Sequence, residues 1–171
     1  MNISGDVIID KVQYRVEPLY IDNSAKMNLA LMPSTFYNPI IPFNHDISGK
    51  IVPGFMVYVS GRPGSFPFRF KFEFKDDTKV FFQFDVRFDE CTVVRNHRDN
   101  GWAKEERDLT HFPFSPGVGF DMIFYVRDVD FMVAVNGQHF VNFTHRLLPL
   151  SDIKYFNING DVAVTSLRFC D

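Results

Sequence analysis

Polar side chains spaced for hydroxyl recognition gather between Gln83 and Arg107. Gln83, Asp85 and Arg87 alternate with apolar residues, so an extended strand would place these three polar side chains on one face. Amide, carboxylate and guanidinium groups on one face offer donors and acceptors to sugar hydroxyl groups. Trp102 adds a flat apolar ring on which the C–H face of a sugar can pack. Together these residues predict a carbohydrate-binding groove.

The same stretch resembles the sugar-binding signature of the galectin family. That signature reads H-x-N-P-R on one strand, then V-x-N, then W-x-x-E-x-R. The residues at the matching positions are Gln83, Asp85, Val86 and Arg87, then Val94 and Asn96, then Trp102, Glu105 and Arg107. The second half of the signature is intact, whereas the first half keeps only its Arg. The resemblance implies a lectin that recognises β-galactosides in glycoproteins or glycolipids and needs no cofactor.

The resemblance also implies a role for each retained residue. Trp102 would stack on the apolar face of a galactose-like ring. Arg87 would donate to the ring oxygen and the axial 4-hydroxyl, and Asn96 would contact the 6-hydroxyl. Glu105 would accept hydrogen bonds from sugar hydroxyls, with Arg107 as one of the Arg residues that orient it. Charge-assisted hydrogen bonds of this kind are the strong ones.

Two substitutions fall on the residues that set sugar preference in the signature. Gln83 stands where the family has His, and Asp85 stands where it has Asn. An ionised Asp can only accept hydrogen bonds, and it can instead pair with Arg87 and occlude that guanidinium. The hypothesis is therefore a weakened or altered glycan specificity. The alternative is a galectin-like protein-interaction module that has lost sugar binding.

Purely structural roles for single residues of this stretch stay open at this point. Trp102 can be a core residue, since most aromatic side chains are buried, although the neighbouring Asn100-Gly101 turn and polar residues favour exposure. Glu105 and Arg107 can form an ordinary surface ion pair, which would contribute little.

Catalysis and metal binding find little support in the sequence. Asp85 and Glu105 are the candidate carboxylate pair of a glycosidase, but each would have a neighbouring Arg that keeps it ionised, which is poor for a general acid. The five His residues are scattered without ligand spacing. We therefore expect neither an enzyme nor a metal site.

The elements that must position these residues are strands. Alternation of period two predicts strands over 69–75, 80–84, 120–126, 131–135 and 139–143. The dipeptides Asn136-Gly137 and Asn159-Gly160 are typical of hairpin turns. Short strands at this spacing predict an all-β fold, a two-sheet antiparallel sandwich of jelly-roll type. The galectin resemblance agrees, with residues 36–42 as its opening strand.

The resemblance covers residues 36–171 as a carbohydrate-recognition domain and leaves residues 1–35 as an N-terminal arm or extension. The arm is expected to pack on the sandwich, cap the groove or form a dimer. Because the chain offers only one site, crosslinking of glycans would require a homodimer.

The composition limits which other partners and which cellular compartment can be expected. The 171 residues include 21 Phe, which need a sizeable core. The formal charge of −3 and the lack of a run of basic residues argue against binding to nucleic acid. No apolar run is long enough to span a membrane. The two distant Cys residues and the absence of a signal peptide suggest a cytoplasmic protein. Its resemblance to galectins implies that it can also be secreted without such a peptide.

Overall fold

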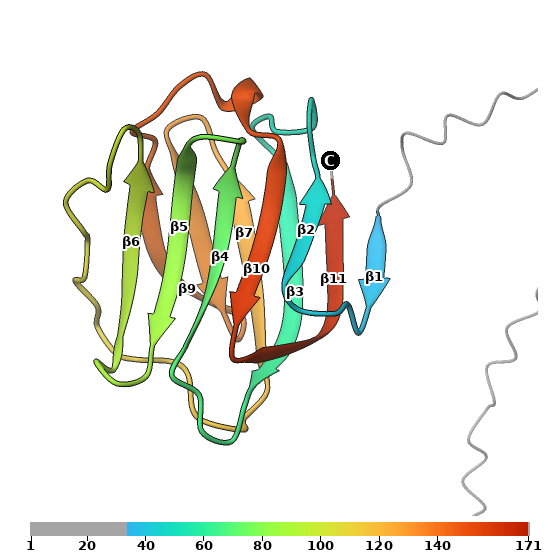
Figure 1. Ribbon diagram of the computed structural model, residues 1–171, viewed down its shortest axis with the longest axis vertical. Coiled ribbons are helices and arrows are strands. Elements are labelled where there is room, and N and C mark those ends of the chain that lie inside the picture. Colours follow the sequence, from blue (N-terminus) through green and yellow to red (C-terminus); the bar gives the residue numbers. More distant parts are fainter. Residues whose placement is uncertain (1–33, 171) are drawn as a thin grey trace, which may run out of the picture. The chain divides into compact units, whose positions relative to one another are not determined.

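The computed structural model describes residues 34–170, and Figure 1 shows them as two layers of strands. The predicted N-terminal arm, residues 1–35, therefore lies outside the described residues except for Ser34 and Thr35.

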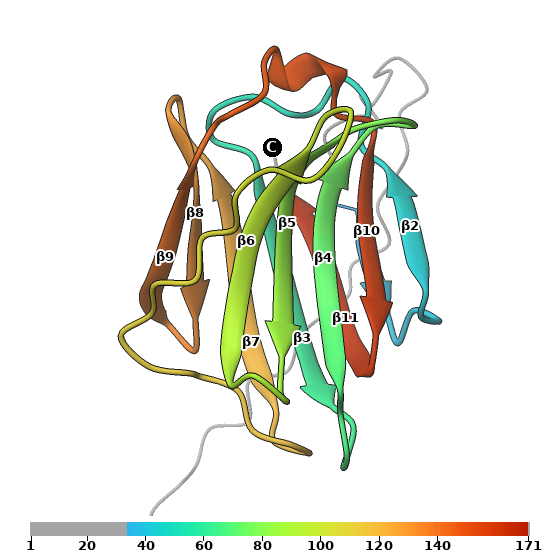
Figure 2. The same ribbon diagram turned by 60° about the vertical axis from the view of Figure 1, so that its left-hand side comes forward.

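Two antiparallel sheets pack face to face, as Figures 1 and 2 show. The six-stranded sheet has the order β1 (Thr35–Tyr37), β11 (Val162–Cys170), β3 (Met56–Pro63), β7 (Phe120–Val126), β8 (Asp130–Val135) and β9 (Gln138–Thr144). The five-stranded sheet has the order β2 (Phe43–Asp46), β10 (Tyr155–Gly160), β4 (Arg69–Lys75), β5 (Val80–Arg87) and β6 (Thr92–Arg98). A short 3₁₀ turn, η2 (Leu150–Asp152), precedes β10. The predicted sandwich is confirmed.

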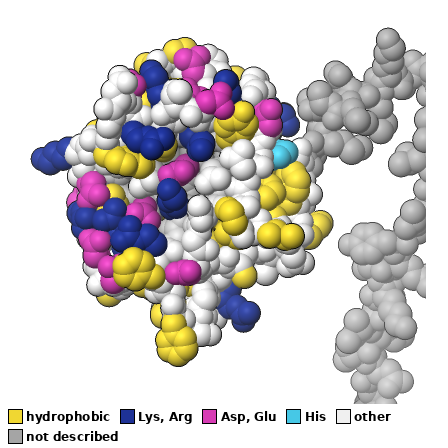
Figure 3. Space-filling model, viewed as in Figure 1, with side chains coloured by type: hydrophobic (Ala, Val, Ile, Leu, Met, Phe, Trp, Pro, Cys, Tyr) yellow, Lys and Arg dark blue, Asp and Glu magenta, His cyan; other side chains and the backbone are white. Residues whose placement is uncertain are grey.

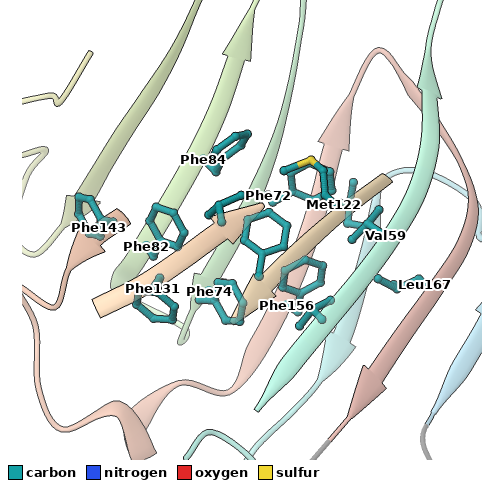
Figure 4. Packing of buried hydrophobic residues seen from close by; sticks show 14 of the residues in the cluster. Val59, Phe72, Phe74, Phe82, Phe84, Met122, Phe131, Phe143, Phe156 and Leu167 are labelled. Atoms are coloured by element: carbon teal, nitrogen blue, oxygen red, sulfur yellow. The ribbon is translucent and has the colours of Figure 1, made fainter. Parts of the chain in front are cut away.

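Phenylalanine rings from both sheets fill the space between the layers (Figure 4). The ring centroid of Phe82 on β5 lies 4.9 Å from that of Phe131 on β8 and 4.8 Å from that of Phe143 on β9. Phe72 on β4 meets Phe124 on β7 at 5.2 Å. Aromatic pairs at these separations add to the free energy of burying their area. The Phe side chains thus lock the two sheets together, and Arg69, Lys71 and Asp85 of β4 and β5 are left on the outer face of the five-stranded sheet.

Two hairpins bring predicted strands together, and the second has the predicted turn at Asn136-Gly137. β4 and β5 pair through a turn in which Oδ1 of Asp76 accepts hydrogen bonds from the backbone N–H groups of Thr78 and Lys79, both at 2.6 Å. β8 and β9 pair through Asn136 and Gly137, whose φ values are 52° and 77°. Both residues are in the left-handed region that a type I′ turn requires.

The predicted opening strand over residues 36–42 is wrong as a single element. The chain instead leaves β1 in the six-stranded sheet after Tyr37 and enters β2 in the five-stranded sheet at Phe43. Pro39 and Pro42 lie in the connection, and proline has no N–H to donate to a sheet ladder. The proline pair thus marks the crossing between the sheets.

The predicted hairpin turn at Asn159-Gly160 is also wrong, because β10 and β11 belong to different sheets. Gly160 has φ 104°, and a Cβ placed on it would lie 2.4 Å from the carbonyl oxygen of Arg69. The glycine is needed where the chain passes closely over the start of β4 and changes sheet.

Candidate functional site

The polar ladder of β5 lies on the outer face of the five-stranded sheet. Phe84 and Val86 point inward and are fully buried, as the alternation predicts. The register pairs Gln83 with Asn96 on β6. On the other side, Asp85 pairs with Lys71 on β4. The predicted residues of β5 therefore lie on an interior strand, between β4 and β6, which contribute further polar side chains.

A groove of about 510 Å³ runs over this part of the sheet. It is lined by Arg69, Lys71, Gln83, Asp85, Arg87, Asn96, Trp102, Ala103 and Glu105. Of the seven predicted site residues only Arg107 is not part of this lining. The sequence analysis missed Arg69 and Lys71, although the clean alternation of the β4 segment was a signal that they share a face.

Trp102 forms one wall of the groove and is 49% exposed, so the interpretation as a core residue is wrong. Asn100 and Gly101 have φ values of 53° and 143° and turn the chain back along β6. Isolated antiparallel bridges join Trp102 to Arg98 and Glu106 to Arg95, which holds this segment beside β6. The Arg98 guanidinium lies 5.5 Å from the Trp102 ring centroid and supports it by a cation–π contact.

Asn96 holds the Trp102 segment in place as well as lining the groove. It is only 2% exposed. Its Nδ2 donates to the carbonyl oxygen of Ala103 at 2.8 Å, and its Oδ1 accepts from the backbone N–H of His97 at 2.9 Å. These two bonds occupy much of the amide's hydrogen-bonding capacity, so Asn96 positions the wall of the groove.

Arg87, Glu90, Arg107 and Glu105 form a closed ring of alternating charge. Arg87 donates to Glu90 at 3.0 Å and to Glu105 at 3.2 Å. Arg107 donates to Oε2 of Glu105 at 2.6 Å and also to Glu90. Figure 3 shows these opposite charges gathered on one side of the molecule. Glu105 and Arg107 are thus part of a network and do not form an isolated surface pair.

Glu90 was not predicted as a site residue. It lies in the short connection between β5 and β6, and the sequence analysis could not foresee that it folds back onto two Arg side chains. The one hint in the sequence was that Glu90 lies in a short connection, close to the ends of both β5 and β6. Glu90 completes the ring that fixes the position of Arg87.

The ring keeps its carboxylates charged. Burial alone would raise the pKa of Glu105, but the hydrogen bond from Arg107 and the charge of Arg87 lower it below its ordinary value. The pKa of Glu90 is lowered by its bonds from Arg107 and Arg87. Burial opposes the charge of Arg87, yet the bonds to Asp85 and Glu90 raise its pKa. Glu105 therefore stands at the groove as an ionised acceptor.

Asp85 forms the floor of the groove and is only 3% exposed. Its Oδ2 accepts from Nε of Arg87 at 2.7 Å and lies 4.0 Å from Nη1 of Arg69. Its Oδ1 is buried and finds no hydrogen-bond partner among residues 34–170. The pairing with Arg87 that the sequence suggested is present.

Within residues 34–170, no group of three or more His, Cys, Asp or Glu side chains is placed to hold a metal ion. In the same range, no helix has the length and apolar character needed to cross a membrane.

The fold and the groove define a β-sandwich binding domain whose outer sheet face carries ionised groups beside one exposed indole ring. Residues 42–169 match the galactoside-binding lectin family, and the chain belongs to this family. The resemblance to galectins is thereby confirmed.

Curated relatives and solved structures agree with this assignment. The chain is 35% identical to galectin-4 of Bos taurus over 139 residues, which is 78% of this chain. It is 32% identical to galectin-3 of Oryctolagus cuniculus over 130 residues, 74% of this chain. These matches span 41% and 53% of the relatives' own lengths, so the chain covers about half of each.

Two solved structures have the same fold. The Caenorhabditis elegans galectin LEC-6 superimposes with a TM-score of 0.74 at 28% identity. The match includes 80% of this chain and 96% of the LEC-6 chain. Sheep galectin-11 in complex with glycerol superimposes with a TM-score of 0.67 at 28% identity. The match includes 75% of this chain and 96% of the galectin-11 chain.

Proposed function

We propose that this protein binds galactose-containing glycans of glycoproteins or glycolipids in the groove over β4, β5 and β6. Binding is non-covalent and requires no cofactor. The observation that carries the proposal is the half-exposed Trp102 ring beside an ionised Glu105 whose position is fixed by Arg87 and Arg107. An apolar platform next to fixed acceptors and donors suits one sugar ring, which has an apolar face and hydroxyl edges.

The energetics of such a site favour modest affinity. Covering the indole ring of Trp102 with a sugar ring removes apolar area from water and contributes roughly 1–2 kcal/mol. Glu105 adds charge-assisted hydrogen bonds from sugar hydroxyls, and its two Arg partners reduce the ordering cost of binding. Most residues that line the groove are polar or charged, so hydrogen bonds are expected to determine which sugar fits.

The specificity is proposed to differ from that of a galectin with the full signature. Gln83 replaces a His, and its amide can donate or accept. Asp85 replaces an Asn, and an ionised carboxylate can only accept hydrogen bonds, so the donor of the Asn amide is lost. Because Asp85 also holds Nε of Arg87, fewer guanidinium donors remain for the sugar. We therefore expect weaker binding to simple β-galactosides.

Calorimetric titration with lactose and N-acetyllactosamine tests the proposal. Saturable binding that Trp102→Ala abolishes is the expected result. Tyr37→Ala serves as the matched control, since Tyr37 is exposed on β1 in the other sheet and should leave affinity unchanged. Binding that survives Trp102→Ala would refute this location for the site.

One observation favours the alternative of a protein-interaction module. Arg87 already bonds to Asp85, Glu90 and Glu105, which is compatible with a groove closed to sugars. Absence of binding to both disaccharides and to an array of galactose-containing glycans would favour this alternative.

A further inference from the structure

The chain segment over residues 102–108 has two sides, and only one of them faces the groove. Trp102 and Glu105 line the groove. Glu106 and Asp108 instead line a second hollow of about 390 Å³, whose other wall is β9. Figure 2 shows the connection between β6 and β7 passing between β6 and β9. The reverse side of this groove wall therefore faces a hollow rather than a packed core.

Few backbone hydrogen bonds hold the segment to β6. The N–H and the carbonyl oxygen of Glu106 bond to the backbone of Arg95 at 2.9 and 3.0 Å. The N–H of Ala103 donates to the carbonyl oxygen of His97 at 3.2 Å. Among the residues that the structure describes, no backbone-to-backbone hydrogen bond involves residues 107–114. Side chains must therefore fix the chain beyond Glu106.

Arg95 supplies such a side chain. It pairs with Phe84 on the inward face of the five-stranded sheet and is only 2% exposed. Its Nη2 donates to Oδ1 of Asp108 at 2.6 Å, and its Nη1 donates to the carbonyl oxygen of Asp108 at 3.0 Å. Charge-assisted bonds to a buried guanidinium are strong and directional. They tie the end of the segment to β6.

Arg146 ties the same segment to the other sheet. It follows β9, and its guanidinium lies 4.8 Å from the ring centroid of Phe143 on that strand. Its Nη1 donates to the carbonyl oxygen of Lys104 at 3.0 Å, and its Nη2 donates to Glu106. The segment is thus clamped from its reverse side by one Arg from each sheet.

We propose that Arg95 is a positioning residue for galactoside binding. It does not line the groove and acts through Asp108. Asp108 directly follows Arg107, whose guanidinium bonds to Glu105. Release of Asp108 frees this end of the segment, and the acceptor at the groove is then no longer fixed before the sugar arrives. The effect on sugar affinity rests on the proposed function, whereas the effect on the segment itself does not.

Calorimetric titration with lactose and hydrogen exchange of the ligand-free chain test this inference together. Arg95→Met keeps an unbranched side chain without the charge and should lower lactose affinity about fivefold, because Glu105 is less fixed. Deuterium uptake over residues 103–110 should rise in the same variant, since the segment opens locally. Asp108→Asn should act in the same direction and add little to Arg95→Met in the double variant, because both remove one interaction.

Leu167→Val is the matched control for a general loss of stability. Leu167 is fully buried on β11, next to the edge strand β1 and away from β6. The loss of buried apolar volume should lower the melting temperature. Lactose affinity and the exchange of residues 103–110 should stay unchanged, since nothing behind the groove wall is altered.

Each outcome decides the question. The inference is overturned if Arg95→Met lowers only the melting temperature, or if Leu167→Val lowers lactose affinity as much. If Arg95→Met does not fold, Asp108→Asn decides by the same two measurements, since it changes an exposed side chain. If the native chain binds no lactose, the proposed function is refuted, and the exchange of residues 103–110 still decides whether Arg95 holds the segment.

Discussion

Nε of Arg87 donates a hydrogen bond of 2.7 Å to Oδ2 of Asp85 and is thereby tied to the floor of the groove. A charged partner at this point stiffens the guanidinium and occupies one of its donors. The departure from the galectin signature at Asp85 therefore acts on Arg87, a residue that matches the signature.

Asp85→Asn is expected to raise the affinity for lactose about threefold to tenfold. A neutral amide binds Arg87 less strongly than a carboxylate and supplies a donor of its own. Calorimetric titration checks this. Asp89→Asn changes the same charge in the adjacent connection, where Asp89 is exposed, and should have little effect. Equal or weaker binding by Asp85→Asn would contradict the proposed role.

Glu90→Gln is expected to weaken lactose binding about fivefold, which corresponds to about 1 kcal/mol. Glu90 need not touch the sugar, since its effect comes from opening the ring that fixes Arg87 and Arg107. Affinity and melting temperature should both be measured. Asp77→Asn removes an exposed ion pair with Lys154 and serves as the control that leaves affinity intact. An unchanged affinity in Glu90→Gln would mean that the ring does not orient the site.

Binding should be insensitive to pH over the neutral and weakly acidic range. The pKa of Glu105 and that of Glu90 both lie below their ordinary value. A carboxyl with a lowered folded pKa contributes stability above its unfolded value of about 4.3, and this contribution is lost as the pH falls through the folded pKa. Lactose affinity should therefore be constant from about pH 8 to about pH 5 and fall only below about pH 4. A decline already near pH 6 would show that a His controls binding instead.

Gly160→Ala is expected to destabilise the fold by about 2–4 kcal/mol, because a Cβ would meet the backbone of Arg69 and the φ of 104° is strained for alanine. Chemical denaturation measures the loss. Gly49→Ala is the matched control, since Gly49 also has a positive φ of 73° but open space around its Cβ position. Equal losses in the two variants would assign the effect to backbone strain alone.

The sequence by itself determined the layer architecture and the candidate site residues. Alternation placed Phe84 and Val86 inside and Gln83, Asp85 and Arg87 on the opposite face, because side chains of a strand alternate strictly. The local turn at Asn100 and Gly101 predicted that Trp102 would be exposed. These features depend only on neighbours in the chain, so they can be read without knowing the fold.

Only the tertiary structure decided which strands pair and which side chains meet across them. Asn159-Gly160 looks like a hairpin turn, yet β10 and β11 separate into two sheets because each finds its hydrogen-bond partners elsewhere in the chain. The burial of Asp85 comes from its place on an interior strand, flanked by β4 and β6. The ring that Glu90 closes requires a connection to fold back on Arg107, seventeen residues away in sequence. Such contacts arise from packing between distant segments, and no local pattern encodes them.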